Sequence, residues 1–129
     1  MSLRLFVPQD TTACALGADV TAHTLEREAA ARGLDIELVR NGSRGLFWLE
    51  PLLEVERDSQ RLAFGPVLAK DIPSVLDALG ENATTHPLYR GSTEEIPYLK
   101  KQQRLTFSRA GIGDPLCLYS YQALNGFKG

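Results

Sequence analysis

The sequence predicts an α/β fold in which helices cover a mixed β-sheet. Short apolar runs that end at proline, glycine or polar turns alternate along the chain with segments of helical period. The chain has 129 residues. A chain of this size buries about two-thirds of the surface that it exposes when unfolded, which is enough for one hydrophobic core.

Composition and charge exclude several classes of protein. Fourteen basic residues stand against sixteen acidic ones, a net charge of −2, so no bulk positive field is present to hold nucleic acid. No apolar run approaches the roughly 20 residues of a membrane helix, and Pro8 interrupts the N-terminal apolar stretch too early for a signal peptide. The two cysteines have no disulfide or metal-ligand spacing. We therefore expect a cytoplasmic chain that binds neither nucleic acid nor membrane.

The first third of the chain predicts a parallel β-α-β unit. Residues 3–7 form a short apolar run that predicts a strand, and the polar residues 9–14 predict a loop. Residues 17–32 have a helical period that places four apolar side chains on one face, at Ala18, Ala22, Leu25 and Ala29. Residues 34–39 alternate and predict a second strand. A strand, helix and strand in close succession pack as a right-handed parallel unit.

The next segment predicts a hairpin and a second helix. Residues 52–56 and 61–64 are two strands joined by a polar turn, and residues 71–79 are a short helix capped by Asp71. A polar, proline-interrupted linker follows at 81–87, and the rest of the chain has no clean periodicity. The order β-α-β-β-β-α indicates a thioredoxin-like mixed sheet with two helices, followed by an irregular C-terminal extension.

The residues alone contain no complete catalytic or metal-binding motif. Cys14 precedes a helix, where a thiol can be reactive, but no second cysteine follows at thioredoxin spacing, so a structural or vestigial thiol is favoured. The glycine-rich residues 41–46 lack the ending of a phosphate-binding loop. The apolar run 46–49 contains the only tryptophan and fits either core packing or a partner surface. A local basic stretch fits a solvated face or an anion clamp, at Lys100, Lys101, Arg104 and Arg109.

Longer runs resemble one family. Residues 40–55 resemble the start of the beta, or flavoprotein, subunit of soluble NAD-dependent formate dehydrogenases that contain molybdenum or tungsten. Three further segments resemble the same family. They are residues 64–67, residues 94–100, and residues 104–111 together with Asp114 and Pro115. The resemblance spans essentially the whole chain.

The resemblance implies a chain in two parts. Subunits of this family begin with a thioredoxin-like domain, similar to the ferredoxins that carry a 2Fe–2S cluster. They continue into a module shared with the NADH-oxidising flavoprotein subunit of respiratory complex I. Residues 1–85 resemble the first part, and residues 86–129 resemble a linker and the start of the FMN- and NAD-binding module. FMN, NAD and a four-iron, four-sulfur cluster are expected in the full-length subunit, with their ligands beyond Gly129, and none is expected in this segment.

The cluster ligands of the ferredoxin-like relatives are replaced in this sequence. Their second ligand loop reads Gly-Cys-x-Gly-x-Cys, and Ser43 and Phe47 stand at its two cysteine positions, while Cys14 is one relic of the first loop. Because such clusters are held by cysteine thiolates, we expect this domain to carry none. The resemblance leaves it a docking role, with Arg44, Phe47 and Trp48 as candidate docking residues and no catalytic residue.

We therefore expect the N-terminal part of a formate dehydrogenase beta subunit. Its partners would be a molybdenum or tungsten alpha subunit and a small iron–sulfur gamma subunit, and the whole enzyme would pass electrons from formate to NAD⁺. The segment by itself should be inactive. Two alternatives remain open. One is the flavin subunit of another NAD-linked complex such as a hydrogenase, and the other is a free-standing thioredoxin-like binding module.

Overall fold

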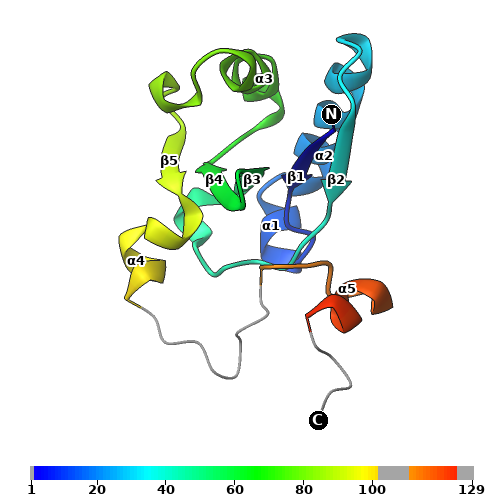
Figure 1. The fold of residues 1–129 in the computed structure, drawn as a ribbon, viewed down its shortest axis with the longest axis vertical. Helices are drawn as coiled ribbons and strands as arrows, with labels where there is room; N and C mark the ends of the chain where they lie inside the picture. Colours follow the sequence, from blue (N-terminus) through cyan, green and yellow to red (C-terminus); the bar gives the residue numbers. More distant parts are fainter. Residues whose placement is uncertain (1, 102–110, 125–129) are drawn as a thin grey trace.

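A five-stranded mixed sheet forms the centre of the computed structural model, which describes residues 2–101 and 111–124. The strand order is β2-β1-β3-β4-β5 (Figure 1). The strands are β1 (Leu3–Phe6), β2 (Ile36–Val39), β3 (Leu53–Arg57), β4 (Gln60–Phe64) and β5 (Tyr89–Ser92). β1 and β2 are parallel, and the other neighbours are antiparallel. The predicted α/β class with a mixed sheet is confirmed.

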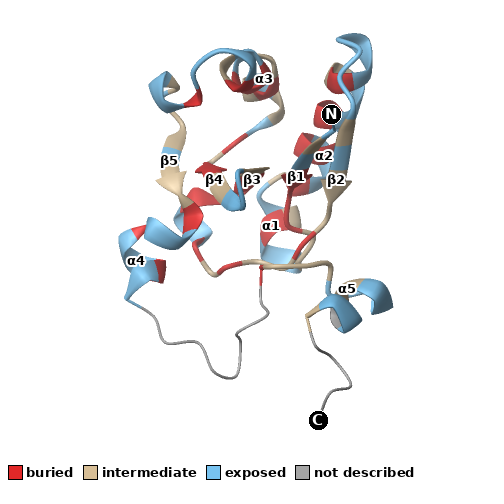
Figure 2. Cartoon of the chain, in the orientation of Figure 1, coloured by how far each residue is buried: buried red, intermediate tan, exposed pale blue. Residues whose placement is uncertain are grey.

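Two helices pack on one face of this sheet and enclose the main core. They are α2 (Ala18–Ala31) and α3 (Ile72–Gly80), and both correspond to predicted helices. The four apolar residues predicted on one face of the first helix are at most 3 % exposed. Three of them, Ala18, Ala22 and Leu25, pack in one cluster with strand residues such as Leu5, Val55 and Phe64. Figure 2 shows the buried residues of α2, α3 and the central strands in red.

A short helix, α1 (Thr11–Ala15), occupies most of the segment that was predicted as a loop. Asp10 caps it, because its carboxylate accepts a hydrogen bond from the Ala13 amide at 3.5 Å. Gly17 separates α1 from α2 with φ of +103°, a conformation that favours glycine. The loop prediction was therefore wrong here, because five residues are too few to show a helical period.

The sheet also extends past residue 85. β5 lies in the region predicted to be irregular, and it pairs with β4 through Leu62 with Ser92 and Phe64 with Tyr89. A strand of four residues next to a proline-interrupted segment has little signal of its own, so its existence depends on pairing with β4. The 3-10 turns η2 (Ala69–Asp71) and η3 (Ala83–Thr85) flank α3. Within the described part of the chain, no helix is long and apolar enough to cross a membrane.

A second, smaller core lies under the loop between β2 and β3. Leu46, Leu49 and Leu52 of this loop pack with Ala63 of β4. The same cluster includes Ile96 and Leu99, which belong to the start and body of helix α4 (Pro97–Lys100). This cluster therefore joins the β2–β3 loop to α4, although about fifty residues separate the two in sequence.

Gly65 shows how tightly this second core is packed. A Cβ added at this position would overlap the carbonyl oxygen of Leu49, a backbone atom that cannot rotate away. We expect Gly65→Ala to lower the free energy of unfolding by about 1–3 kcal/mol, the usual cost of overpacking. Urea denaturation followed by circular dichroism measures this change. Gly80→Ala is the control, because a Cβ there meets nothing within 4 Å, and equal stability of the two variants would contradict the packing described.

Candidate functional site

Two loops at one end of the sheet lie side by side. The Gln9 amide, just after β1, donates a hydrogen bond to the Asn41 carbonyl at 3.0 Å. The Gln9 side-chain amide also donates to the carbonyl of Arg40 at 2.8 Å. Cys14 follows the first loop in α1, and Ser43 lies in the second loop. The structure therefore brings together the two segments that the family resemblance assigns to a former cluster site.

Cys14 is held as a thiol in this arrangement. Its Sγ lies 3.4 Å from the Gln9 carbonyl oxygen and 3.5 Å from Oδ1 of Asp19. Burial raises the pKa of Cys14, and the hydrogen bond to the Asp19 carboxylate raises it further. A raised pKa disfavours the thiolate that reactivity and metal ligation require.

Ser43 and Phe47 are equally unsuited to metal ligation. The Ser43 hydroxyl donates to Oε1 of Glu50 at 3.1 Å and accepts from the Gly45 amide at 3.0 Å. Phe47 has no ligand atom, and its side chain is exposed. Across residues 2–101 and 111–124, no group of three or more His, Cys, Asp and Glu residues could hold a metal ion. The residues at this site do not fit a 2Fe–2S cluster, whose irons need thiolates.

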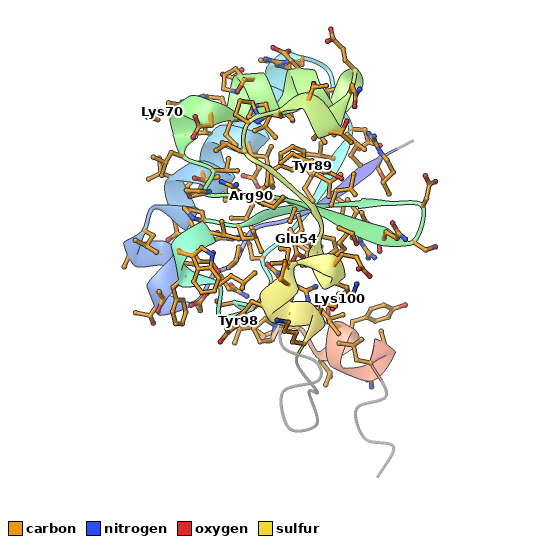
Figure 3. The ribbon with its side chains drawn as sticks, turned by 90° about the vertical axis from the view of Figure 1, so that its left-hand side faces the viewer. Glu54, Lys70, Tyr89, Arg90, Tyr98 and Lys100 are labelled. Carbon is orange, nitrogen blue, oxygen red and sulfur yellow. The ribbon has the colours of Figure 1, made fainter. Side chains whose placement is uncertain are left out.

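The tip of the β2–β3 loop presents aromatic side chains to solvent. Phe47 and Trp48, in the 3-10 turn η1 (Phe47–Leu49), are 54 % and 59 % exposed. The Trp48 ring meets the ring of Tyr98 edge to face, with centroids 5.3 Å apart. Tyr98 lies on α4 (Figure 3) and is also exposed. Tyr98 is the member of this pair that the sequence did not indicate, because nothing local links it to the loop.

Arg44 does not share this exposure. Its side chain is 2 % exposed, and its Nε lies 2.5 Å from Oε1 of the buried Glu54 on β3. Its Nη1 lies 2.8 Å from Oε1 of Glu94 in the turn η4 (Thr93–Glu95), which leads into α4. Arg61 on β4 also contacts Glu54, at 3.0 Å. Arg44 therefore holds the loop to the sheet and to η4, and its side chain is not available at the surface for the predicted docking.

The sheet face opposite α2 and α3 has a row of alternating charges. The strand register places Glu37, Arg4, Glu56 and Arg61 next to one another on four adjacent strands. Arg4 contacts Glu37 at 3.2 Å and Glu56 at 3.5 Å. The Arg61 guanidinium lies over the Phe6 ring, 3.6 Å from its centroid. Because charges of opposite sign alternate, the row is neutralised within the chain.

Residues 111–114 cross part of this face and are held by side chains from three places in the fold. The Gly111 carbonyl accepts hydrogen bonds from the Asn41 side-chain amide at 2.8 Å and from the Arg61 guanidinium at 2.7 Å. The Gln9 side-chain amide donates to Oδ1 of Asp114 at 2.8 Å. Residues 111–114 are therefore tied to the same two loops that hold Cys14 and Ser43.

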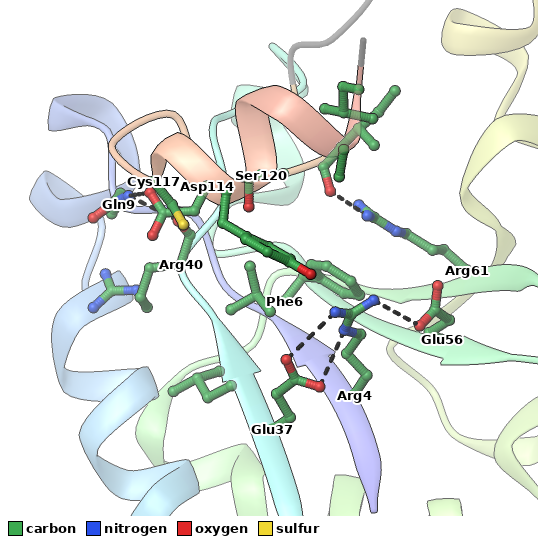
Figure 4. A pocket seen from close by; sticks show the side chains of 17 residues that line it. Arg4, Phe6, Gln9, Glu37, Arg40, Glu56, Arg61, Asp114, Cys117 and Ser120 are labelled. Carbon is green, nitrogen blue, oxygen red and sulfur yellow. Dashed lines mark hydrogen bonds and ion pairs between the residues drawn. The ribbon is translucent and has the colours of Figure 1, made fainter. Parts of the chain in front are cut away.

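Helix α5 (Leu118–Ala123) follows and borders an open cleft of about 620 Å³ against the sheet (Figure 4). The arginines that line this cleft are Arg4, Arg40 and Arg61, and each contacts a carboxylate of the chain. A hydrogen bond with the Ser120 backbone lowers the pKa of Cys117 at the cleft edge. The basic stretch that the sequence suggested as an anion clamp is described only in part. Lys100 pairs with Glu95 at 2.9 Å, while Arg104 and Arg109 lie outside the described residues.

Glu50 is buried and gives the site a pH dependence. Burial raises its pKa above the ordinary 4.5, although the Leu52 amide and the Ser43 hydroxyl donate to it. The folded state thus holds this proton more tightly than the unfolded state. The contribution of Glu50 to stability is full below the ordinary pKa and is lost as pH rises through the raised folded value.

The side chain introduced by Glu50→Gln cannot ionise, so the variant should not lose this contribution to stability as pH rises. We expect its free energy of unfolding, relative to the wild type, to rise between about pH 4 and about pH 8. Urea denaturation at the two pH values measures the difference. Glu95→Gln, at an exposed position, is the control and should show a much smaller trend. A Glu50→Gln difference that does not change with pH would contradict the assignment.

Comparison with known proteins establishes the fold. The sequence matches no protein-family model and no curated protein. Among solved structures, the chain is similar to a cysteine-to-serine variant of the thioredoxin-like 2Fe–2S ferredoxin from Aquifex aeolicus, with a TM-score of 0.53 and 15 % identity. The match covers 70 % of this chain and 97 % of the ferredoxin. The chain has a thioredoxin-like fold, as the order of its elements predicted.

Proposed function

We propose that this chain is the N-terminal part of the beta subunit of a soluble NAD-dependent formate dehydrogenase, and that it docks this subunit onto its neighbours without carrying a cluster. The resemblance of residues 40–55 supports the family, and the thioredoxin-like fold is the one that the family requires. The observation that carries the docking role is the exposed Phe47–Trp48 tip. It sits on a loop whose Ser43 hydroxyl is already used in hydrogen bonds.

In the proposed enzyme, formate is oxidised in the alpha subunit and electrons reach NAD⁺ through iron–sulfur clusters and FMN. The cofactors supply the redox chemistry, and the protein supplies binding and orientation. FMN, NAD and the four-iron, four-sulfur cluster would be bound by parts of the subunit beyond Gly129. The 129-residue chain then contributes only its fold and its docking surface, and it should show no formate or NADH turnover alone.

The docking surface has the composition of a protein interface. Aromatic side chains are enriched at interface centres and carry much of the binding energy. Phe47, Trp48 and Tyr98 are exposed here, and an exposed ion pair of Glu95 and Lys100 lies on the adjoining turn and helix. An apolar centre with a charged neighbourhood suits contact with another subunit better than contact with a small charged ligand.

The proposal is tested by isolating the complex that contains the full-length subunit. We expect a tag on this subunit to recover a molybdenum- or tungsten-containing large subunit and formate-dependent reduction of NAD⁺. Recovery of a nickel-containing large subunit would instead establish the hydrogenase alternative. A chain that remains alone and binds no flavin when produced at full length would establish a free-standing binding module. Either result would overturn the formate dehydrogenase proposal.

A further inference from the structure

The β2–β3 loop is closed on itself by two of its own side chains. The Ser43 hydroxyl donates to one carboxylate oxygen of Glu50 at 3.1 Å, and the other oxygen accepts from the Leu52 amide at 2.9 Å. Ser43 also accepts from the Gly45 amide. Glu50 is only 4 % exposed, and hydrogen bonds shielded from water hold more strongly than exposed ones. These contacts join the beginning of the loop to its end.

Inside the closed segment, apolar side chains point in two directions. Leu46 and Leu49 are buried in the second core, together with Leu99 of α4. Phe47 and Trp48 lie between them in sequence and are exposed. Since the flanking leucines are anchored and the loop ends are joined, the two aromatic residues are directed outward. The contact of Trp48 with Tyr98 further limits its freedom.

We infer that Ser43 and Glu50 form a clasp that positions Phe47 and Trp48 for docking. A loop that is ordered before binding loses less conformational freedom on binding, which raises affinity. Ser43 and Glu50 are thus positioning residues, and this inference rests on the proposed docking function.

The clasp can be tested without any partner, because Trp48 is the only tryptophan of the chain. We expect Ser43→Ala to lower the fluorescence anisotropy of Trp48 and to raise its quenching by acrylamide about twofold, as the tip gains local motion. Ser43→Thr keeps the hydroxyl, so its anisotropy and quenching should equal those of the wild type. Glu50→Gln should also show wild-type anisotropy and quenching, because the new side-chain amide can donate to Ser43 while its carbonyl accepts from the Leu52 amide.

Ser74→Ala is the matched control. The Ser74 hydroxyl also makes two hydrogen bonds, to Asp71 and His86, but it lies on α3, away from the loop. Its loss should leave the Trp48 signals unchanged, and circular dichroism should show that all four variants are folded. Unchanged anisotropy and quenching in Ser43→Ala would overturn the clasp, whatever the chain binds.

A second measurement separates the clasp from the docking function. In the assembled complex, Ser43→Ala should weaken subunit binding about tenfold, and Ser43→Thr should restore it. Suppose that Ser43→Ala increases the motion of Trp48 but leaves subunit binding unchanged, while Trp48→Ala weakens subunit binding. The positioning role is then overturned, and the docking role of Trp48 stands. If Trp48→Ala also leaves binding unchanged, the proposed docking at this loop is what fails.

Discussion

Arg44→Ala is expected to lower the free energy of unfolding by about 3–5 kcal/mol, the cost of breaking a buried ion pair from one side. Arg44 contacts Glu54, which is 1 % exposed, and also Glu94. Without the guanidinium, Glu54 would keep Arg61 alone as a charged partner among the described residues. The variant would also release the β2–β3 loop from η4. Urea denaturation followed by circular dichroism measures the loss.

Lys100→Ala is the control for this result. Lys100 also forms an ion pair, with Glu95, but both side chains are more than 60 % exposed. Exposed pairs contribute about 0–1 kcal/mol, because water screens them and their side chains lose entropy. A loss of less than about 1 kcal/mol in Arg44→Ala would show that the buried network does not hold the loop in the way described.

If the proposed function is right, replacing both Phe47 and Trp48 by alanine is expected to weaken binding to the proposed partner subunits by about 2–4 kcal/mol, or roughly 30- to 1,000-fold. Both side chains are exposed in the isolated chain, so their removal should change the free energy of unfolding by less than about 1 kcal/mol. Loss of binding with stability retained distinguishes docking from folding. Titration calorimetry with the proposed alpha and gamma subunits measures the first quantity, and urea denaturation the second.

Leu116→Ala controls for removal of any exposed apolar side chain. Leu116 is 84 % exposed, in the segment before α5, and its loss should leave subunit binding unchanged. Wild-type affinity in the Phe47 and Trp48 double variant would contradict the docking surface. An equal loss in Leu116→Ala would mean that docking depends on general surface hydrophobicity, which also contradicts it.

Most regular elements of the fold could be predicted because their signals are local. Ala18, Ala22, Leu25 and Ala29 repeat at helical spacing, and all four are buried in the structure. The hairpin of β3 and β4 likewise follows from two apolar runs and a short turn. Elements α1 and β5 were missed, because one depends on the Asp10 cap and the other on pairing with a distant strand. Helices α4 and α5 were also missed, because four and six residues are too few to show a helical period.

The site could be predicted only in part, because residue types were visible in the sequence but their neighbours were not. Phe47 and Trp48 are exposed, and their role in docking stays a prediction. Arg44 was predicted to dock with them, yet its side chain is buried. The sequence did not indicate this, because the ion-pair partner Glu94 lies fifty residues away. Tyr98 was missed for the same reason, since only the second core brings α4 beside the loop.

The central claim is that this thioredoxin-like domain has no 2Fe–2S cluster and uses the former cluster loop for docking. The most direct test is the iron and sulfide content of the chain after anaerobic reconstitution with iron and sulfide, with the Aquifex aeolicus ferredoxin treated in parallel. We predict that the ferredoxin gains iron, sulfide and visible absorption bands, while this chain gains none above a denatured control. A chain that retains about two iron and two sulfide ions, with the same bands, would contradict the account.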